Sequence, residues 1–244
     1  AISIHTVTAF LYSANTGRPF WHNALLAPRF IASAFCSGPA LAIIILQLVR
    51  RLAHYPVRQS AIDTLGVTMT VALQITLFFV IAELFTDFYS EGTHSASARY
   101  LFFGLHGASM LTPWIWTALA MLVVAVTILM VYPLRRNPAL FTLACVLTVI
   151  GVWIEKGMGL VIPGYIPTPL GEVFEYLPNW TEVSISLGIW AIGLLTFTLL
   201  AKAGMAIERG QVRLRDDIEE ELAGLTEDKE DGDMESLAHQ QPVK

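Results

Sequence analysis

Four charged residues lie at the ends of long apolar stretches, where a charge is expensive to bury. They are Arg29, Glu83, Glu155 and Glu182. In hydrocarbon, ionisable side chains usually pair with one another or lie on a substrate or proton path. Arg29 is expected to neutralise Glu83 or Glu155, since an unpaired buried charge is unfavourable. A structural ion-pair network and a proton-handling or polar ligand site both fit this pattern, because the carboxylates outnumber the arginine.

Two histidines near the N-terminus are candidates for hydrogen bonding to a polar ligand. His5 lies inside an apolar helical stretch, where an imidazole can hydrogen-bond to a quinone oxygen and pass a proton. His22 lies at the boundary of such a stretch, where a histidine more often serves as a hydrogen-bonded interfacial residue. None of the five predicted membrane spans carries a histidine at its middle, so a haem buried between two histidines is not expected.

The cysteines do not have the spacing of a metal site. Cys36 and Cys145 lie 109 residues apart, and there is no CxxC or CxxCH sequence. Iron–sulfur clusters, covalently attached haem and structural zinc are therefore not expected in this chain alone.

The composition indicates a membrane protein. Hydrophobic residues make up 55% of the 244 residues and charged residues 14%, whereas a typical soluble domain has about 25% charged residues. The mean hydropathy is +0.58. One domain of this size cannot hide so much apolar surface in its own core, so lipid is the expected solvent. The net charge of −5 argues against a nucleic-acid binder.

Five apolar stretches are long enough to cross a bilayer as helices, which takes about 20 residues each. None shows the alternating pattern of barrel strands. The expected fold is therefore an all-α polytopic transmembrane helical bundle over residues 1–206. Residues 1–12 have the character of the end of a preceding helix, so the chain is expected to be incomplete at its N-terminus. The spans are predicted near residues 24–49, 63–86, 111–134, 137–158 and 182–204.

Basic residues alternate from one connection to the next and predict the orientation of the spans. The connections at 87–110 and 157–181 hold only Arg99 between them, so they are expected to face outward. The connections rich in base are expected to face the cytoplasm, as is the C-terminus; their basic residues are Arg50, Arg51, Arg58, Arg135, Arg136, Lys202, Arg209, Arg213 and Arg215.

The C-terminal segment, residues 207–244, differs from the rest. It holds 12 acidic and 5 basic residues, so the acidity of the protein resides in this segment. Residues 214–225 can form a short amphipathic helix, whereas the sequence TEDKEDGDMES that follows is typical of disorder. The segment is predicted to be a partly disordered cytoplasmic tail. It either is simply solvated or docks a cytoplasmic partner.

Three stretches together carry a family resemblance. They are SIHTVTAFLYSANTGRPFWHNALLAPRFIASAFCSGPAL (3–41), FFVIAELFTDFYS (78–90) and GVWIEKGMGLVIPGYIPTPLGEVFEYLPNWTEVSISLG (151–188). In combination they resemble the NrfD/polysulfide-reductase membrane-subunit family. Within it they look closest to the DsrP/HmcC-like branch of sulfur-metabolism and haem-rich redox complexes.

The resemblance implies a protein of the prokaryotic cytoplasmic membrane that binds menaquinone and carries no haem or iron–sulfur cluster of its own. The implied partners are an extracytoplasmic iron–sulfur subunit, a multihaem cytochrome c, and other membrane and cytoplasmic redox subunits. The resemblance places the quinone beside His5, His22 and Arg29. It assigns proton transfer or structural pairing to Glu83, Glu155 and Glu182.

The predicted function is therefore that of a quinone-interacting membrane subunit of a multisubunit respiratory complex of the sulfur-metabolism type. It would exchange electrons between menaquinol and extracytoplasmic subunits. One alternative is an ion or small-solute transporter, which the absence of any mid-span charge in the five predicted spans disfavours. Another is a structural anchor for redox subunits, in which His5, Arg29 and the glutamates could be replaced without loss of turnover.

Overall fold

Regular structure in the described part of the chain is helical, as the sequence predicts. The computed structural model describes residues 2–89, 93–168, 170–176, 179–208 and 210. Within these ranges there is no β-strand, and the one isolated β-bridge joins Leu105 to Ala108 in a turn. The all-α fold class is thereby confirmed. The predicted acidic tail falls almost wholly on residues outside the described ranges.

The helices follow one another with short connections. The longer ones are α1 (Ile2–Ser13), α2 (Leu26–Leu52), α3 (Gln59–Tyr89), α4 (Thr93–Phe102), α5 (Thr112–Met130), α7 (Pro138–Trp153) and α9 (Trp180–Glu208). The shorter elements are η1 (Pro19–Trp21), α6 (Tyr132–Arg136), the π-helical turn η2 (Ile154–Met158), α8 (Gly159–Val161) and η3 (Pro163–Tyr165).

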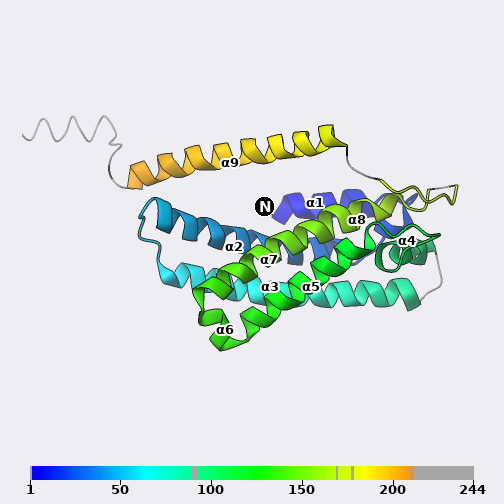
Figure 1. The fold of residues 1–244 in the computed structure, drawn as a ribbon, viewed down its shortest axis with the longest axis horizontal. Helices are drawn as coiled ribbons and strands as arrows, with labels where there is room; N and C mark the ends of the chain where they lie inside the picture. The colour runs from blue at the N-terminus through cyan, green and yellow to red at the C-terminus, as the bar shows by residue number, and fades with distance from the viewer. Residues whose placement is uncertain (1, 90–92, 169, 177–178, 209, 211–244) are drawn as a thin grey trace, which may run out of the picture. The chain divides into compact units, whose positions relative to one another are not determined.

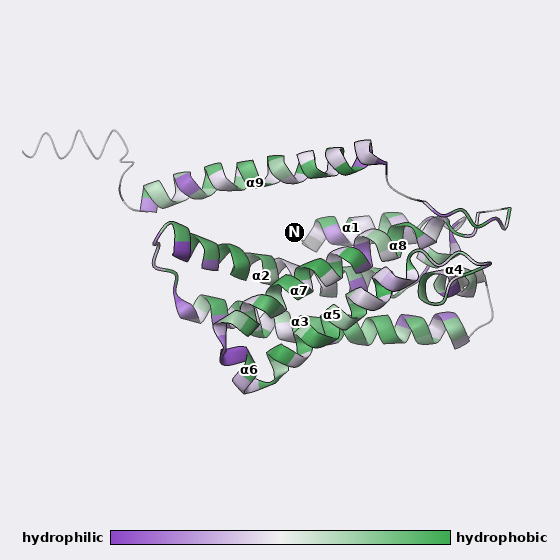
Figure 2. Cartoon of the chain, in the orientation of Figure 1, coloured by the Kyte–Doolittle hydropathy of each residue, from purple (hydrophilic) through white to green (hydrophobic). Residues whose placement is uncertain are grey.

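Five helical segments are long and apolar enough to cross a membrane. They are Leu26–Leu52, Gln59–Tyr89, Thr112–Met130, Pro138–Tyr165 and Trp180–Glu208. Each overlaps one of the predicted spans. Hydrophobic residues dominate the middle of the long helices, whereas hydrophilic residues gather at α6 and at the C-terminal end of α2 (Figure 2).

The chain divides into two compact units, residues 1–176 and 177–244. The described part of the second unit consists mainly of α9. Its apolar side chains point in all directions within that unit, and Ile189, Leu194 and Phe197 are among the exposed ones. A helix that is apolar all round needs lipid or other helices about it.

In the first unit α2 lies among three long helices. It packs against α1, α3 and α7, while α5 packs against α7 and α3 (Figure 1). Small residues allow the close approaches, as is usual between membrane helices. A Cβ on Gly66 of α3 would lie 2.9 Å from Phe141 Cζ of α7, and one on Gly151 of α7 would lie 2.8 Å from Leu122 Cδ2 of α5.

The third span ends earlier than the sequence predicts. A helix to residue 134 is expected, but α5 stops at Met130, and Val131 adopts an extended conformation with ψ of 107°. Pro133 explains the break, since proline has no N–H to donate and its ring clashes with the carbonyl four residues back. The chain then forms the short α6, and the Asn137 side chain caps α7 by accepting from Ala139 N at 3.0 Å.

A cap of short elements covers the end of the bundle where α2 begins. It consists of η1, α4, α8 and η3, which contact one another. Trp21 is its centre: the indole Nε1 donates to the Leu160 carbonyl at 2.9 Å, and the ring lies so close to Gly164 that a Cβ there would overlap it. The buried cap core comprises Phe20, Trp21, Leu26, Tyr100, Leu101, Phe102, Leu111, Ile115, Leu160 and Ile166.

Gly151→Ala should destabilise the bundle, because the new methyl group must displace the Leu122 side chain. The expected loss is about 1–3 kcal/mol of unfolding free energy, as for other overpacked cores. Thermal unfolding of the full chain in detergent, followed by tryptophan fluorescence, measures it. Gly38→Ala in α2 is the matched control, since a Cβ there meets no atom within 4 Å. Equal melting temperatures for the two variants would contradict the close α5–α7 packing.

Candidate functional site

A buried charge cluster lies where α2, α3 and the π turn η2 meet. The Arg29 guanidinium contacts both the Glu83 carboxylate, through Nη1, and the Glu155 carboxylate, through Nη2. Arg29 is 8% exposed, Glu83 7% and Glu155 0%. The sequence predicts that Arg29 pairs with Glu83 or Glu155, and in the structure it pairs with both. One cation holds together three elements that are distant in the sequence.

A second cation completes this cluster. Lys156 Nζ lies 3.4 Å from Glu155 Oε1 and 5.0 Å from the centre of the Phe30 ring, a cation–π contact. The sequence places Lys156 only next to Glu155, and in a regular α-helix neighbouring side chains point in clearly different directions. Both residues belong to η2, whose wider π-helical turn changes these directions. Single π turns of this kind are frequent at functional sites.

Asp87 is a third carboxylate at this place and was not singled out from the sequence. It lies four residues after Glu83, so the two share one face of α3. Asp87 is 8% exposed, and Arg29 is close enough to act on it electrostatically. The spacing of the two acids within FFVIAELFTDFYS is the signal that identifies it. The cluster therefore holds three carboxylates against two cations.

Three polar atoms of the cluster are buried without a hydrogen-bond partner in the described part of the chain. They are Arg29 Nε, Glu155 Oε2 and Lys156 Nζ. Buried polar atoms in proteins nearly always have a partner in protein, water or ligand. Arg29 Nε and Lys156 Nζ are thus donors, and Glu155 Oε2 an acceptor, that the described side chains leave unused.

Aromatic rings lie next to the charges and join them to the cap. Tyr12 at the end of α1 contacts Trp21 edge-on at 4.9 Å between ring centres and Phe30 at 6.4 Å. The neighbours of the charged residues, Phe30, Leu84 and Phe88, pack against the cap core. The cluster thus lies directly beneath the cap, at the end of the bundle.

The two predicted histidines lie on this side of the molecule but differ in environment. His5 is half-buried on α1, which packs against α2. It precedes Tyr12 by two helical turns, about 10 Å along the axis, so it lies deeper in the bundle than the cap. His22 is exposed beside the cap, where Nδ1 hydrogen-bonds to the Ser13 carbonyl at 2.8 Å.

Glu182 belongs to the second unit. It is exposed in the first turn of α9, and its Oε2 accepts a hydrogen bond from Asn179 N at 3.0 Å. That contact caps the start of the helix. The predicted role of Glu182 in proton transfer or structural pairing stays a prediction.

Tyr100 is a titratable residue inside the cap. Its side chain is fully buried, and burial raises the pKa of the phenol above its ordinary value of 10, with a smaller contribution from the Glu175 carboxylate. The phenol therefore stays neutral at physiological pH. It contributes packing and polarity to the cap rather than charge.

Within the described residues, no group of three or more His, Cys, Asp or Glu side chains is arranged to hold a metal ion. Cys36 is buried in α2, where its sulfur lies 3.1 Å from the Thr76 hydroxyl of α3. Cys145 is likewise buried and not in a disulfide.

The fold and the cluster define a multi-pass membrane protein with a buried ionic centre beneath an aromatic cap. Residues 1–168 match the family described as "Polysulphide reductase, NrfD". The match covers more than half of the chain, so the protein belongs to the NrfD family. It is an integral membrane member of that family, as the apolar helices require.

Three relatives are similar over most of the chain. A putative dimethyl sulfoxide reductase membrane subunit of Halobacterium salinarum is 26% identical over 219 residues, 80% of this chain and 48% of the relative. A selenate reductase subunit of Mesobacillus selenatarsenatis is 25% identical, covering 82% and 47%. The integral membrane subunit of menaquinone reductase of Nitratidesulfovibrio vulgaris is 28% identical, covering 70% and 41%. The chain spans about half the length of these relatives.

Arg29→Gln should destabilise the protein strongly, because it leaves two buried carboxylates without a counter-charge. The expected loss is about 3–5 kcal/mol of unfolding free energy, the usual effect of breaking a buried ion pair on one side. The triple variant Arg29→Gln/Glu83→Gln/Glu155→Gln should recover most of it. Thermal unfolding of the full chain in detergent measures both.

Arg18→Gln is the matched control for this loss of charge. Arg18 lies over the exposed ring of Tyr165, 5.0 Å from its centre, outside the cluster. If Arg29→Gln unfolds at the same temperature as Arg18→Gln, the cluster does not hold the three elements together.

Proposed function

We propose that this protein is the quinone-interacting membrane subunit of a multisubunit respiratory oxidoreductase, exchanging electrons between menaquinol and extracytoplasmic iron–sulfur and cytochrome subunits. The buried cluster of Arg29, Glu83, Glu155 and Lys156 carries the proposal, since it combines charges with unpartnered donor and acceptor atoms at one end of the bundle. A relative named for menaquinone reductase supports the choice of quinone.

The chemistry of the cluster fits a quinone. Menaquinol supplies two electrons and two protons when it is oxidised. Arg29 Nε and Lys156 Nζ can donate to a ring oxygen, and Glu155 Oε2 can accept from a hydroxyl. In the same proposal His5 borders the ring from α1, and the exposed His22 and the start of α2 with Arg29 border its entrance.

The carboxylates provide a route for the protons. Glu155 accepts a proton from the hydroxyl, and Glu83 and Asp87 lie next along α3 toward the end of the bundle. The family resemblance also assigns proton transfer or structural pairing to Glu182 of α9. Arg29 and Lys156 hold the carboxylates in place and stabilise their ionised form, which is the form that can accept a proton.

Partners and orientation belong to the same proposal. The capped end faces outward and offers its surface to an extracytoplasmic iron–sulfur subunit, with a multihaem cytochrome c and other redox subunits in the complex. The arginine-rich end and the C-terminal tail face the cytoplasm of a prokaryotic inner membrane. The DsrP/HmcC-like resemblance further assigns the complex to sulfur metabolism.

Purification of the full complex from native membranes tests the function. Co-purification of an iron–sulfur protein, a cytochrome and stoichiometric menaquinone, with no metal in this subunit, is the expected result. Isolation of the protein without a redox partner or quinone would contradict the proposal and direct attention to solute transport.

Glu155→Gln should lower menaquinol-dependent turnover of the assembled complex by about a hundredfold, because the amide cannot take up the proton. Stopped-flow oxidation of a soluble menaquinol analogue measures it, with the amount of each subunit determined in parallel. Glu172→Gln is the matched control, an exposed acid outside the cluster. Normal turnover in an assembled Glu155→Gln complex would favour the anchor function, in which the cluster is purely structural.

His5→Ala tests the quinone side separately. If the imidazole borders the quinone ring, the variant should raise the KM for the menaquinol analogue by about five- to tenfold, the loss of one hydrogen bond, with a smaller effect on kcat. An unchanged KM in a fully assembled complex would remove His5 from the site.

A further inference from the structure

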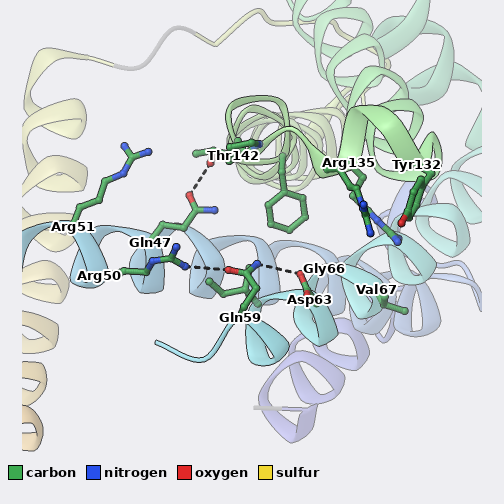
Figure 3. Close-up of a pocket in the computed structure, with 14 residues that line it drawn as sticks. Gln47, Arg50, Arg51, Gln59, Asp63, Gly66, Val67, Tyr132, Arg135 and Thr142 are labelled. Carbon is green, nitrogen blue, oxygen red and sulfur yellow. Dashed lines mark hydrogen bonds between the residues drawn. The ribbon is translucent and has the colours of Figure 1, made fainter. Parts of the chain in front are cut away.

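A cavity of about 590 Å³ lies at the end of the bundle opposite the charge cluster. Its walls come from the end of α2, the start of α3, α6 and the start of α7 (Figure 3). Arg50 at this end follows Arg29 by 21 residues of one helix, which places the cavity about 30 Å from the cluster along α2. The proposed quinone function does not use this cavity.

The charge that lines this cavity is predominantly positive. Arginines from α2 and α6 contribute four guanidinium groups against the single carboxylate of Asp63; they are Arg50, Arg51, Arg135 and Arg136. In the part of the chain that the structure describes, none of the four is in an ion pair. A group of arginines without acidic partners is suited to bind an anion.

Hydrogen bonds and a cation–π contact hold some of these side chains in place. Arg50 Nη1 donates to Gln59 Oε1 at 3.0 Å, and Gln59 Nε2 donates to Asp63 Oδ1 at 3.2 Å. The Arg136 guanidinium lies 4.7 Å from the centre of the Tyr132 ring. Each arginine keeps donors that these contacts do not use, since a guanidinium carries five N–H groups.

The arginines approach the cavity from different helices. Figure 3 shows Arg50 of α2 and Arg135 of α6 on opposite sides of the space, while Arg51 extends away from Arg50 toward the edge. In addition, α3 and α7 begin at this cavity, and the positive ends of their helix dipoles favour a negative charge there. Arg50, Arg135 and the starts of α3 and α7 therefore place positive potential at this cavity.

Apolar groups form the rest of the cavity wall. Ile62 and Phe141 are buried, and the close approach of Phe141 to Gly66 closes the wall between α3 and α7. Val67, which is 51% exposed, continues this wall onto the apolar outer surface of α3. An occupant with a charged group and an apolar part fits such a lining better than a free ion does.

We propose that this cavity binds the phosphate group of an anionic phospholipid, with the head group between Arg50 and Arg135 and the acyl chains along α3. A soluble phosphate compound carries the same phosphate group and is the other possible source of it. The membrane source is favoured because the cavity opens at the end of helices apolar enough to span a bilayer and continues onto an apolar surface. Basic pockets between membrane helices commonly hold such head groups.

Lipid binding to the delipidated full complex tests this proposal. Native mass spectrometry titrates the complex with phosphatidylglycerol, cardiolipin, phosphatidylcholine and inorganic phosphate in turn. Phosphatidylglycerol and cardiolipin should bind, and phosphatidylcholine and inorganic phosphate should not displace them. Arg135→Gln should weaken this binding by about fivefold, the effect of one surface arginine on an anionic lipid. Menaquinol turnover in a saturating lipid mixture should be unchanged.

Arg58→Gln is the matched control, because Arg58 lies on the connection that follows Arg50 and Arg51 at the end of α2 but does not line the cavity. It should leave lipid affinity unchanged. Equal weakening by Arg58→Gln and Arg135→Gln would overturn the site in favour of diffuse attraction to the membrane surface. Displacement of the lipid by inorganic phosphate at comparable concentration would overturn the lipid assignment, as would the absence of any preference for anionic lipids.

Discussion

The compensation of buried charge around Arg29 sets the arrangement of the first unit. Packing of Leu, Val and Ile side chains stabilises a bundle without direction, so many helix registers bury nearly equal apolar area. The contacts of Arg29 with Glu83 and Glu155 have direction, because a carboxylate left alone in this environment is strongly unfavourable. They require the start of α2, the end of α3 and the turn after α7 to meet at one level, which also positions the aromatic cap above them.

The molecule separates its polar chemistry into two ends. The middle of the bundle is apolar, with Cys36, Ala40, Leu73 and Leu122 among its fully buried residues. In hydrocarbon the helices satisfy their own backbone groups, so polar side chains are needed mainly where the chain leaves the membrane. One end carries the carboxylates and two cations beneath the cap. The other carries arginines without acidic partners. An excess of carboxylates at one end suits the proposed proton transfer, and an excess of arginines at the other suits the proposed binding of lipid phosphate.

The same contacts serve structure and the proposed chemistry. A purely structural network would need only enough carboxylates to balance its cations, whereas Asp87 exceeds that balance and Glu155 keeps an oxygen without a partner. These two features distinguish the cluster from a simple ion pair, and they support its assignment to proton transfer.

The sequence alone determined the helical class, the five apolar segments and the pairing of Arg29 with a glutamate, because hydropathy and the cost of a buried charge are local properties of the chain. Only the tertiary structure decided which residues share the site. Lys156 joins the cluster because it lies in the π turn η2, and Asp87 joins it because it shares a face of α3 with Glu83. The end of α5 at Met130 follows from Pro133, whose effect depends on the local backbone. Arginines of α2 and α6 likewise line one cavity although Arg50 and Arg135 are 85 positions apart, and no spacing within the sequence encodes that proximity.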